Sequence, residues 1–538
     1  MPIWIQQYDP FGNLALSALS AAFPLFLLFY LLAIKKMPGY KAAFFCTLSA
    51  LAIAGLFWRM PLQLAASASL MGAAFGLFPI IWVVVTAIWI YNMTVECGEF
   101  EKIKHSLATL TDDRRLQAIF IAFSFSAFLE GASGFGTPVA ICAAVLMGLG
   151  FNPFQAAAIC LVANSAPAAF GVIGLPIIVS GEVAEMEIGV ISRLAGFHLS
   201  ILSFFLPLWI CVILCGFKKS FEIWPALLTA GLSFALSMYL TARFNGPALP
   251  NIVAGLLSLA AMIALLRLWK PAEVWRFTGE AAPVTSAEKP VYGKGSLIRA
   301  WAPYLLLTLL VFIFSHADYK SMVQAFEPRL AWPYLHELVA KTSPIVSPDK
   351  VYGAILKLDI LSASGTAIFL AGLISALIMP GYGLKRALAC FGRSCKQMRF
   401  SILTICLVLS LAYIMNYSGM SSTLGLALTK TGFLFPFFAP IIGWVGVFLT
   451  GSDTSANALF SGLQRATGET LNLNPELMVA VNSSGGVTGK MISPQSISIA
   501  TAATGQSGKE GTLFRFTLRH SLIMLLIVCL MTLIQSYC

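Results

Sequence analysis

Apolar runs long enough to cross a lipid bilayer recur along the whole sequence. A helix needs about 20 apolar residues to span the hydrocarbon region. Continuous candidates cover residues 14–34, 42–58, 194–215, 223–240, 248–268, 300–314, 352–379, 402–416 and 522–536. The run at 62–95 is too long for one straight span, so we expect a tilted or broken helix, or a short segment plus a span, there. Only 11% of the residues are charged and 58% are hydrophobic, a balance that would make a soluble chain precipitate.

These runs predict an all-α integral membrane protein with about 12–14 membrane segments. The formal charge of +11 could indicate a nucleic-acid partner. The basic residues, however, lie in short segments between apolar runs, so we interpret them as orientation signals and expect no nucleic acid. Segments 35–41, 218–219, 267–299, 385–399 and 509–519 are basic and predicted to be cytoplasmic. The acidic loop 181–186, the long loop 316–350 and both termini are then predicted to be external.

Three short sequence matches recur in the same order in the two halves of the chain. Residues 89–92, 128–133 and 162–165 match residues 413–416, 448–453 and 480–483 at nearly the same offset. The predicted orientation makes the helix ending at Asn92 run inward and the helix ending at Asn416 run outward. The sequence therefore predicts two inverted repeats, a transporter architecture with its site near the membrane midplane. The predicted units are 1–216 and 300–538, joined by two linking helices and a cytoplasmic linker over 217–299.

Each predicted unit contains a region that Gly, Pro, Ser and Asn interrupt. We expect a re-entrant hairpin over 116–149 with its tip at 130–136, followed by a broken helix over 153–180 interrupted at 164–171. In the second unit the hairpin covers 433–463 with its tip at 451–455, and the broken helix covers 476–503 with an interruption at 482–494. Unwound backbone at membrane depth must be satisfied by protein, water or ligand. The helix N-termini that follow such breaks suit an anion.

Hydroxyl and amide side chains concentrate in these interrupted regions, which suits a small polar organic anion. The predicted substrate-binding residues are Ser133, Thr137, Asn164, Ser165, Ser452, Thr454, Asn482, Ser483, Thr488 and Lys490. The alternative interpretation is packing, because small residues let membrane helices approach closely. Lys490 could instead snorkel or pair with Asp453.

Two acidic residues, Glu130 and Asp453, lie at the two predicted hairpin tips. Ionisable residues at membrane depth are functional candidates, and a carboxyl group there can carry a proton. We therefore predict that Glu130 and Asp453 couple transport to protons. The alternative for both is a structural ion pair or a helix cap. The 11 cysteines show no metal-binding spacing, so we expect no metal and no cofactor.

Four motifs carry a resemblance to a known family. They are residues 128–138 (FLEGASGFGTP), 164–167 (NSAP), 451–457 (GSDTSAN) and 485–490 (GGVTGK). In these motifs, and nearly end to end, the chain resembles the bacterial L-lactate permease family. The resemblance implies proton-coupled import of L-lactate and related 2-hydroxymonocarboxylates, such as D-lactate and glycolate, through the bacterial plasma membrane. It also implies kinship with an ion-transporter fold of inverted repeats and hairpins whose members move a transport domain like an elevator.

Rival functions stay open at this point. An anion channel also uses broken helices, and a sodium-coupled carboxylate carrier of the same fold could hold sodium with Asn, Ser and backbone carbonyl groups. The residues alone do not decide between proton and sodium coupling. A membrane-embedded enzyme would need a nucleophile–base pair or a metal set, and the sequence contains no HExxH, GxSxG or Cys/His cluster. We therefore expect a transporter in the lipid bilayer rather than an enzyme, with a homodimer as the assembly to test.

Overall fold

The computed structural model describes residues 2–35, 37–108, 110–134, 136–277, 292–345, 349–506 and 509–537. Within these residues eleven helices are long and apolar enough to cross a membrane. Three shorter apolar helices, Pro138–Gly148, Pro153–Ala163 and Ser364–Ile378, accompany them. The prediction of an all-α integral membrane protein is confirmed. The inverted relation of the two units, and their boundaries, stay predictions.

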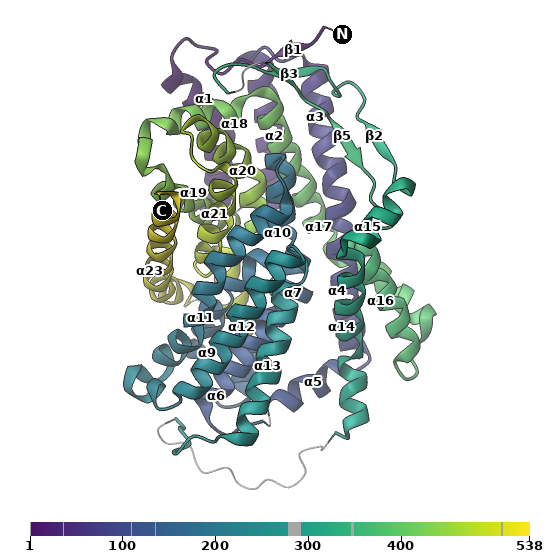
Figure 1. The fold of residues 1–538 in the computed structure, drawn as a ribbon, viewed down its shortest axis with the longest axis vertical. Helices are drawn as coiled ribbons and strands as arrows, with labels where there is room; N and C mark the ends of the chain where they lie inside the picture. Colours follow the sequence, from purple (N-terminus) through teal and green to yellow (C-terminus); the bar gives the residue numbers. More distant parts are fainter. Residues whose placement is uncertain are drawn as a thin grey trace.

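Helices make up most of the chain and follow one another along it (Figure 1). In the first half they are α1 Leu14–Phe29, α2 Gly39–Leu56, α3 Leu62–Phe75, α4 Trp82–Glu96, α5 Glu99–Ala108, α6 Arg114–Ala118, α7 Ser126–Ala132, α8 Thr137–Gly148, α9 Pro153–Ala163, α10 Gly171–Ala184, α11 Ile188–Phe221, α12 Trp224–Phe244 and α13 Pro250–Leu268. In the second half they are α14 Lys294–Ser315, α15 Ala317–Val323, α16 Ser364–Ile378, α17 Gly383–Ser418, α18 Met420–Leu428, α19 Phe435–Thr450, α20 Asp453–Thr470, α21 Pro475–Lys490, α22 Pro494–Ala503 and α23 Glu510–Tyr537.

Short strands join the N-terminus to the long loop of the second half. Strand β1 (Trp4–Ile5) pairs in parallel with β3 (Val339–Lys341), which pairs antiparallel with β4 (Lys350–Val351). Strand β2 (Arg329–Ala331) pairs antiparallel with β5 (Ile355–Lys357). Strands β1 and β3 lie at the upper end of the molecule in Figure 1. The N-terminus and the loop, both predicted to be external, therefore share one end of the molecule.

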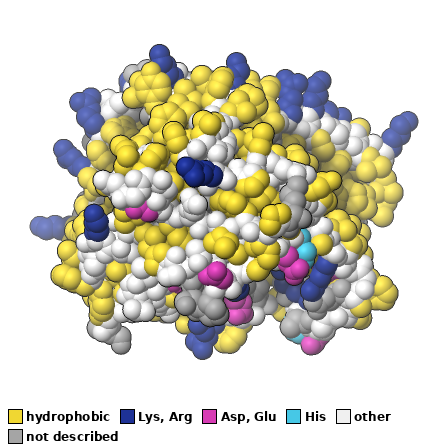
Figure 2. Space-filling model, turned by 90° about the horizontal axis from the view of Figure 1, so that it is seen from above, with side chains coloured by type: hydrophobic (Ala, Val, Ile, Leu, Met, Phe, Trp, Pro, Cys, Tyr) yellow, Lys and Arg dark blue, Asp and Glu magenta, His cyan; other side chains and the backbone are white. Residues whose placement is uncertain are grey.

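The upper end is not uniformly polar. Figure 2 shows hydrophobic side chains over much of it, with Lys and Arg side chains mostly around its edge. Large apolar side chains are also exposed along the helices, among them Leu56, Leu232, Phe244 and Ile534. Apolar surface on this scale is expected where lipid rather than water surrounds the helices.

The long run at residues 62–95 is broken, as predicted. A π-helical segment, Gly76–Ile81, separates α3 from α4, and Phe78 within it leaves the helical conformation (φ −141°, ψ 127°). Phe78 precedes Pro79, and the residue before a proline is driven away from the α region by the proline ring. The break therefore follows from the local sequence.

Two predicted spans have different boundaries in the structure. The span predicted over 352–379 becomes helical only at Ser364, because Tyr352 and β5 belong to the strand-containing loop. The basic segment 385–399 is not a loop, since α17 runs without interruption from Gly383 to Ser418. Lys and Arg are good helix formers, and Lys385, Arg386 and Lys396 stand on the exposed side of α17.

Two predicted connections also change. The acidic loop predicted at 181–186 shrinks, because α10 continues to Ala184 and ends with Glu185 in a left-handed conformation. The polar linker predicted at 281–295 falls at residues 281–291 outside the described residues. Its last part, from Lys294, is already the first turn of α14.

Candidate functional site

The predicted hairpin tips and helix breaks meet around one cavity of about 390 Å³. One wall comes from the breaks: Glu130 of α7, the start of α10, residues 449–455 before and in α20, Lys490 of α21, and the first turn of α22. Other lining residues come from α17, with Ser401, Thr404 and Ile405, and from Leu32 and Gly39 near the α1–α2 connection. The cavity thus lies between the interrupted segments and continuous helices of the other part of the fold.

The backbone at the first break is strained. After α7, Gly134 and Gly136 take positive φ values of 55° and 79°. At the start of α10, Val172 (φ 44°), Ile173 (φ 56°) and Gly174 (φ 72°) are also left-handed. A β-branched residue with positive φ is a genuine outlier, and such conformations concentrate at ligand sites and switch regions. The interruption predicted at 164–171 therefore exists and extends to Gly174.

An ion pair crosses between the two halves of the chain at this cavity. Lys490 Nζ lies 2.6 Å from Glu130 Oε1, and the exposed fractions of the two side chains are 13% and 3%. A methyl group at Gly171 would meet the Glu130 carboxylate, so the glycine leaves room for the pair. The alternative in which Lys490 pairs with Asp453 is wrong for this structure. The structural ion pair considered for Glu130 is present.

Asp453 is the second acid in the cavity wall, and its surroundings differ from those of Glu130. It is the first residue of α20, whose N-cap Ser452 accepts the backbone N–H of Ser455. Its Oδ2 accepts hydrogen bonds from Ser483 Oγ at 3.0 Å and Asn457 Nδ2 at 3.5 Å. In the part of the chain that the structure describes, its Oδ1 accepts no hydrogen bond. Among the described residues, no cation forms an ion pair with Asp453.

A chain of buried amides continues from Asp453 along α20 and α21. Asn457 Nδ2 donates to the carbonyl of Pro176 at 3.0 Å, which ties α20 to α10. Asn482 Nδ2 donates to Asn457 Oδ1 at 2.8 Å, and Gln464 Nε2 donates to Asn482 Oδ1 at 3.2 Å. The network fixes the second hairpin against the first broken helix. Gln464 was not among the predicted site residues, although its spacing from Asp453 and Asn457 puts all three on one face of a helix.

The predicted site residues separate into two groups. Glu130, Ser452, Asp453, Thr454 and Lys490 line the cavity. Ser133, Ser165 and Thr488 instead bond to carbonyl groups of their own helical turns, and Asn482 and Ser483 belong to the amide network. Asn164 is buried away from the cavity lining, and none of the described residues bonds to its Oδ1. The side chain of Thr137 lies outside the described residues. Ser401, Thr404 and Gln495 also line the cavity and were not predicted.

The second predicted interruption, at 482–494, is much shorter in the structure. Helix α21 is regular through Lys490, and only residues 491–493 separate it from α22. The glycines of this segment serve close packing: a methyl group at Gly485 or Gly489 would collide with backbone carbonyls of Pro440 or Trp444 on α19. Close backbone approach is a common use of small residues in membrane helices. Ser493 caps α22 by accepting the backbone N–H of Ser496.

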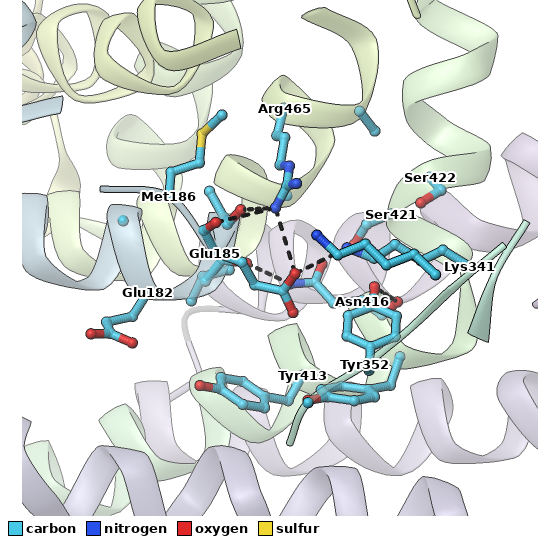
Figure 3. Close-up of a pocket in the computed structure, with 18 of the residues that line it drawn as sticks. Glu182, Glu185, Met186, Lys341, Tyr352, Tyr413, Asn416, Ser421, Ser422 and Arg465 are labelled. Carbon is cyan, nitrogen blue, oxygen red and sulfur yellow. Dashed lines mark hydrogen bonds and ion pairs between the residues drawn. The ribbon is translucent and has the colours of Figure 1, made fainter. Parts of the chain in front are cut away.

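A second cavity, of about 530 Å³, lies beside the C-terminal end of α10 and the second half of α20 (Figure 3). Helices α10 and α20 therefore connect the two cavities, with their first turns at one and later turns at the other. Between the cavities the helices are joined by Ser180 and Ser461, whose hydroxyls lie 2.9 Å apart, and by the Asn457 bond to Pro176.

Comparison with known proteins gives one consistent family. The family model described as L-lactate permease matches residues 17–538. The L-lactate permease of Bacillus subtilis is 45% identical, with 99% of this chain and 98% of the relative covered. The glycolate permease GlcA of Escherichia coli is 44% identical, with 100% and 99% covered. A solved structure of MtrF from Neisseria gonorrhoeae aligns with a TM-score of 0.44 and 13% identity, over 85% of this chain and 81% of that one. With a family model across nearly its whole length and relatives of this similarity, the chain belongs to the L-lactate permease family.

Proposed function

We propose that this chain is a secondary active transporter that imports L-lactate and related 2-hydroxymonocarboxylates, among them D-lactate and glycolate, by proton symport across the bacterial plasma membrane. The names of its relatives, L-lactate permease and glycolate permease, support the substrate class. A cavity of about 390 Å³ lined by a cation, two acids and several hydroxyls supports a small hydroxylated anion as the cargo. The substrate is carried without being converted.

The observation that carries the proposal is the Lys490–Glu130 ion pair in the cavity wall. A lactate carboxylate that enters the cavity competes with Glu130 for the ammonium group of Lys490. If lactate takes Lys490, Glu130 remains buried without its cation, which is costly unless the carboxyl becomes neutral. A proton on Glu130 removes that cost. One anion and one proton therefore bind together and leave together, which is proton symport.

Asp453 is the second candidate for the coupled proton. It is buried, and an ionised Asp453 would carry part of its charge on Oδ1, for which the described residues provide no hydrogen bond. Burial of a charge without a cation is unfavourable. Ser452 and Thr454, on the same turn, can bond the hydroxyl and carboxylate of the substrate. We assign Ser133, Thr137, Asn164, Ser165, Asn482, Ser483 and Thr488 to support of the binding segments.

The deciding experiment measures lactate accumulation in proteoliposomes with independently set pH and sodium gradients. An inward proton gradient should drive accumulation above equilibrium, and a sodium gradient at equal pH should not. Accumulation driven by sodium alone would show the sodium-coupled carrier instead. Flux that only equilibrates lactate under every gradient would show an anion channel. Liposomes with a protonophore provide the control, because they should lose the pH-driven accumulation.

A further inference from the structure

The second cavity has a lining that suits an anion. Its wall contains five cationic residues, Arg329, Lys341, Lys350, Lys357 and Arg465, and three acids, Glu182, Glu185 and Glu469. The cations come from the strand-containing loop and from α20. Because basic residues exceed acidic ones in a concave surface, the field in the cavity attracts anions.

Two of the cations are held by one acid. Lys341 Nζ lies 3.1 Å from Glu185 Oε2, and Arg465 lies 3.5 Å from the same oxygen. Figure 3 shows Arg465 and Lys341 approaching the Glu185 carboxylate from two sides. Arg465 also bonds Glu469 at 2.7 Å. The cavity of about 390 Å³, called the inner cavity below, has the same pattern, because Glu130 pairs there with Lys490, the cation that the proposed function gives to the substrate carboxylate.

The other three cations are exposed to solvent. Arg329, Lys350 and Lys357 are exposed, and within the described part of the chain none of them forms an ion pair. Lys357 interacts electrostatically with Glu182 in the same cavity. Exposed charges around a cleft chiefly raise the local concentration of a counter-ion and its rate of association.

We propose that this cavity is a capture site for small carboxylate anions on the external side of the transporter. Arg329, Lys350 and Lys357 attract the anion, and Lys341 and Arg465 bind its carboxylate in place of Glu185. The cavity lies among the segments predicted to be external, and α10 and α20 lead from it to the inner cavity. The identity of the anion as lactate rests on the proposed function, whereas the anion site itself does not.

The first test compares lactate uptake by intact cells with uptake by inverted membrane vesicles. In the triple variant R329Q/K350Q/K357Q the KM for lactate uptake by intact cells should rise about tenfold at low ionic strength. Tenfold is the lower end of the increase in association rate that a charged cleft provides. The rise in KM should shrink at about 0.15 M ionic strength. The screening length of a charge is then about 8 Å, compared with about 30 Å at about 0.01 M. The KM in inverted vesicles should not change. The matched control K385Q/K396Q/R399Q removes three exposed charges of α17 and should leave the external KM unchanged.

A second test does not depend on transport. Ser422 lines the cavity, and a cysteine introduced there can react with methanethiosulfonates that carry a sulfonate or a trimethylammonium group. The anionic reagent should react faster than the cationic one, and R329Q/K350Q/K357Q should slow the anionic reagent about tenfold. Lactate should protect the cysteine, and K341Q should weaken this protection. Labelling at Ser422→Cys is read by mass spectrometry of its peptide.

The two tests separate the two proposals. Absence of lactate transport together with the expected charge selectivity at Ser422→Cys would refute the proposed function and keep the anion site. Normal transport with an unchanged external KM in the triple variant would refute the capture site and keep the proposed function. An equal rise of KM on both faces, or equal rates for the two reagents, would also refute the capture site.

Discussion

Lys490 is the residue on which the proposed coupling depends, because Glu130 and the substrate carboxylate compete for its single ammonium group. Replacing Lys490 with glutamine removes a charge-assisted hydrogen bond to the substrate, worth about 1.5–3 kcal/mol or about one to two decades in affinity. We expect lactate affinity to fall by this factor, measured by lactate-dependent thermal stabilisation. Lys430→Gln, which removes an exposed lysine of the connection between α18 and α19, is the control. Normal affinity in Lys490→Gln would make the lysine purely structural.

The two acids can be told apart by comparing lactate exchange with pH-driven accumulation. Glu130→Gln mimics the protonated acid and leaves Lys490 available, so substrate should still bind and lactate–lactate exchange should survive. Accumulation driven by pH should fail, because no proton can be released from the amide. Asp453→Asn should show this pattern instead if Asp453 carries the proton. If both variants accumulate lactate normally, neither acid is individually required for coupling.

At the scale of single residues, the sequence predicts which charged side chains lie in the site better than it predicts which of them contact one another. Glu130, Asp453 and Lys490 could be chosen because charged residues at membrane depth are rare. That Lys490 meets Glu130 rather than Asp453 depends on how α7 and α21 pack across the two halves. No local pattern contains that information. Thr404, on continuous helix α17, was missed for the same reason, since it reaches the cavity only through the tertiary fold.

Among the elements, the contact between α19 and α21 is the most closely packed part of the site. A methyl group at Gly443 would collide with the backbone carbonyl of Asn482. Gly443→Ala should therefore force the helices apart and destabilise the protein by about 1–3 kcal/mol. The control is Gly392→Ala in α17, where a methyl group would meet no atom of the described residues within 4 Å. We expect the control to be neutral or more stable by about 0.5–1 kcal/mol. Thermal unfolding in detergent measures both, and equal melting temperatures would contradict the packing argument.

The breaks show where prediction from patterns ends at this scale. Glycine correctly marked the turns after α7 and α19, because it disfavours continued helix. The same pattern was wrong for 482–490, where Gly485, Gly486 and Gly489 lie inside a regular helix. These glycines leave room for the backbone of α19 and for the Asp453 carboxylate. A glycine that breaks a helix and one that admits a neighbour look alike in a single sequence.

For the whole molecule, the orientation in the membrane is the main prediction that the fold makes testable. The pairing of β1 with β3 and of Lys341 with Glu185 places the N-terminus, the long loop and the end of α10 together. These are the segments that the distribution of basic residues predicts to be external. The agreement among these three segments supports the predicted orientation. If one of them had been assigned to the wrong side of the membrane, it would lie at the other end of the molecule.

The orientation can be measured with cysteines placed at exposed positions on the two predicted faces. Ser394 is a poor position, because it is buried and bonded to Asn92 at 2.8 Å. Lys396, exposed on the same helix, and Met322, exposed on α15, are better. A membrane-impermeant thiol reagent added to intact cells should label Met322→Cys and not Lys396→Cys. Permeabilised cells should label both, which shows that each cysteine is reactive. Labelling of Lys396→Cys in intact cells would show that the orientation is the reverse of the predicted one. The second cavity would then lie on the cytoplasmic side instead of the external side.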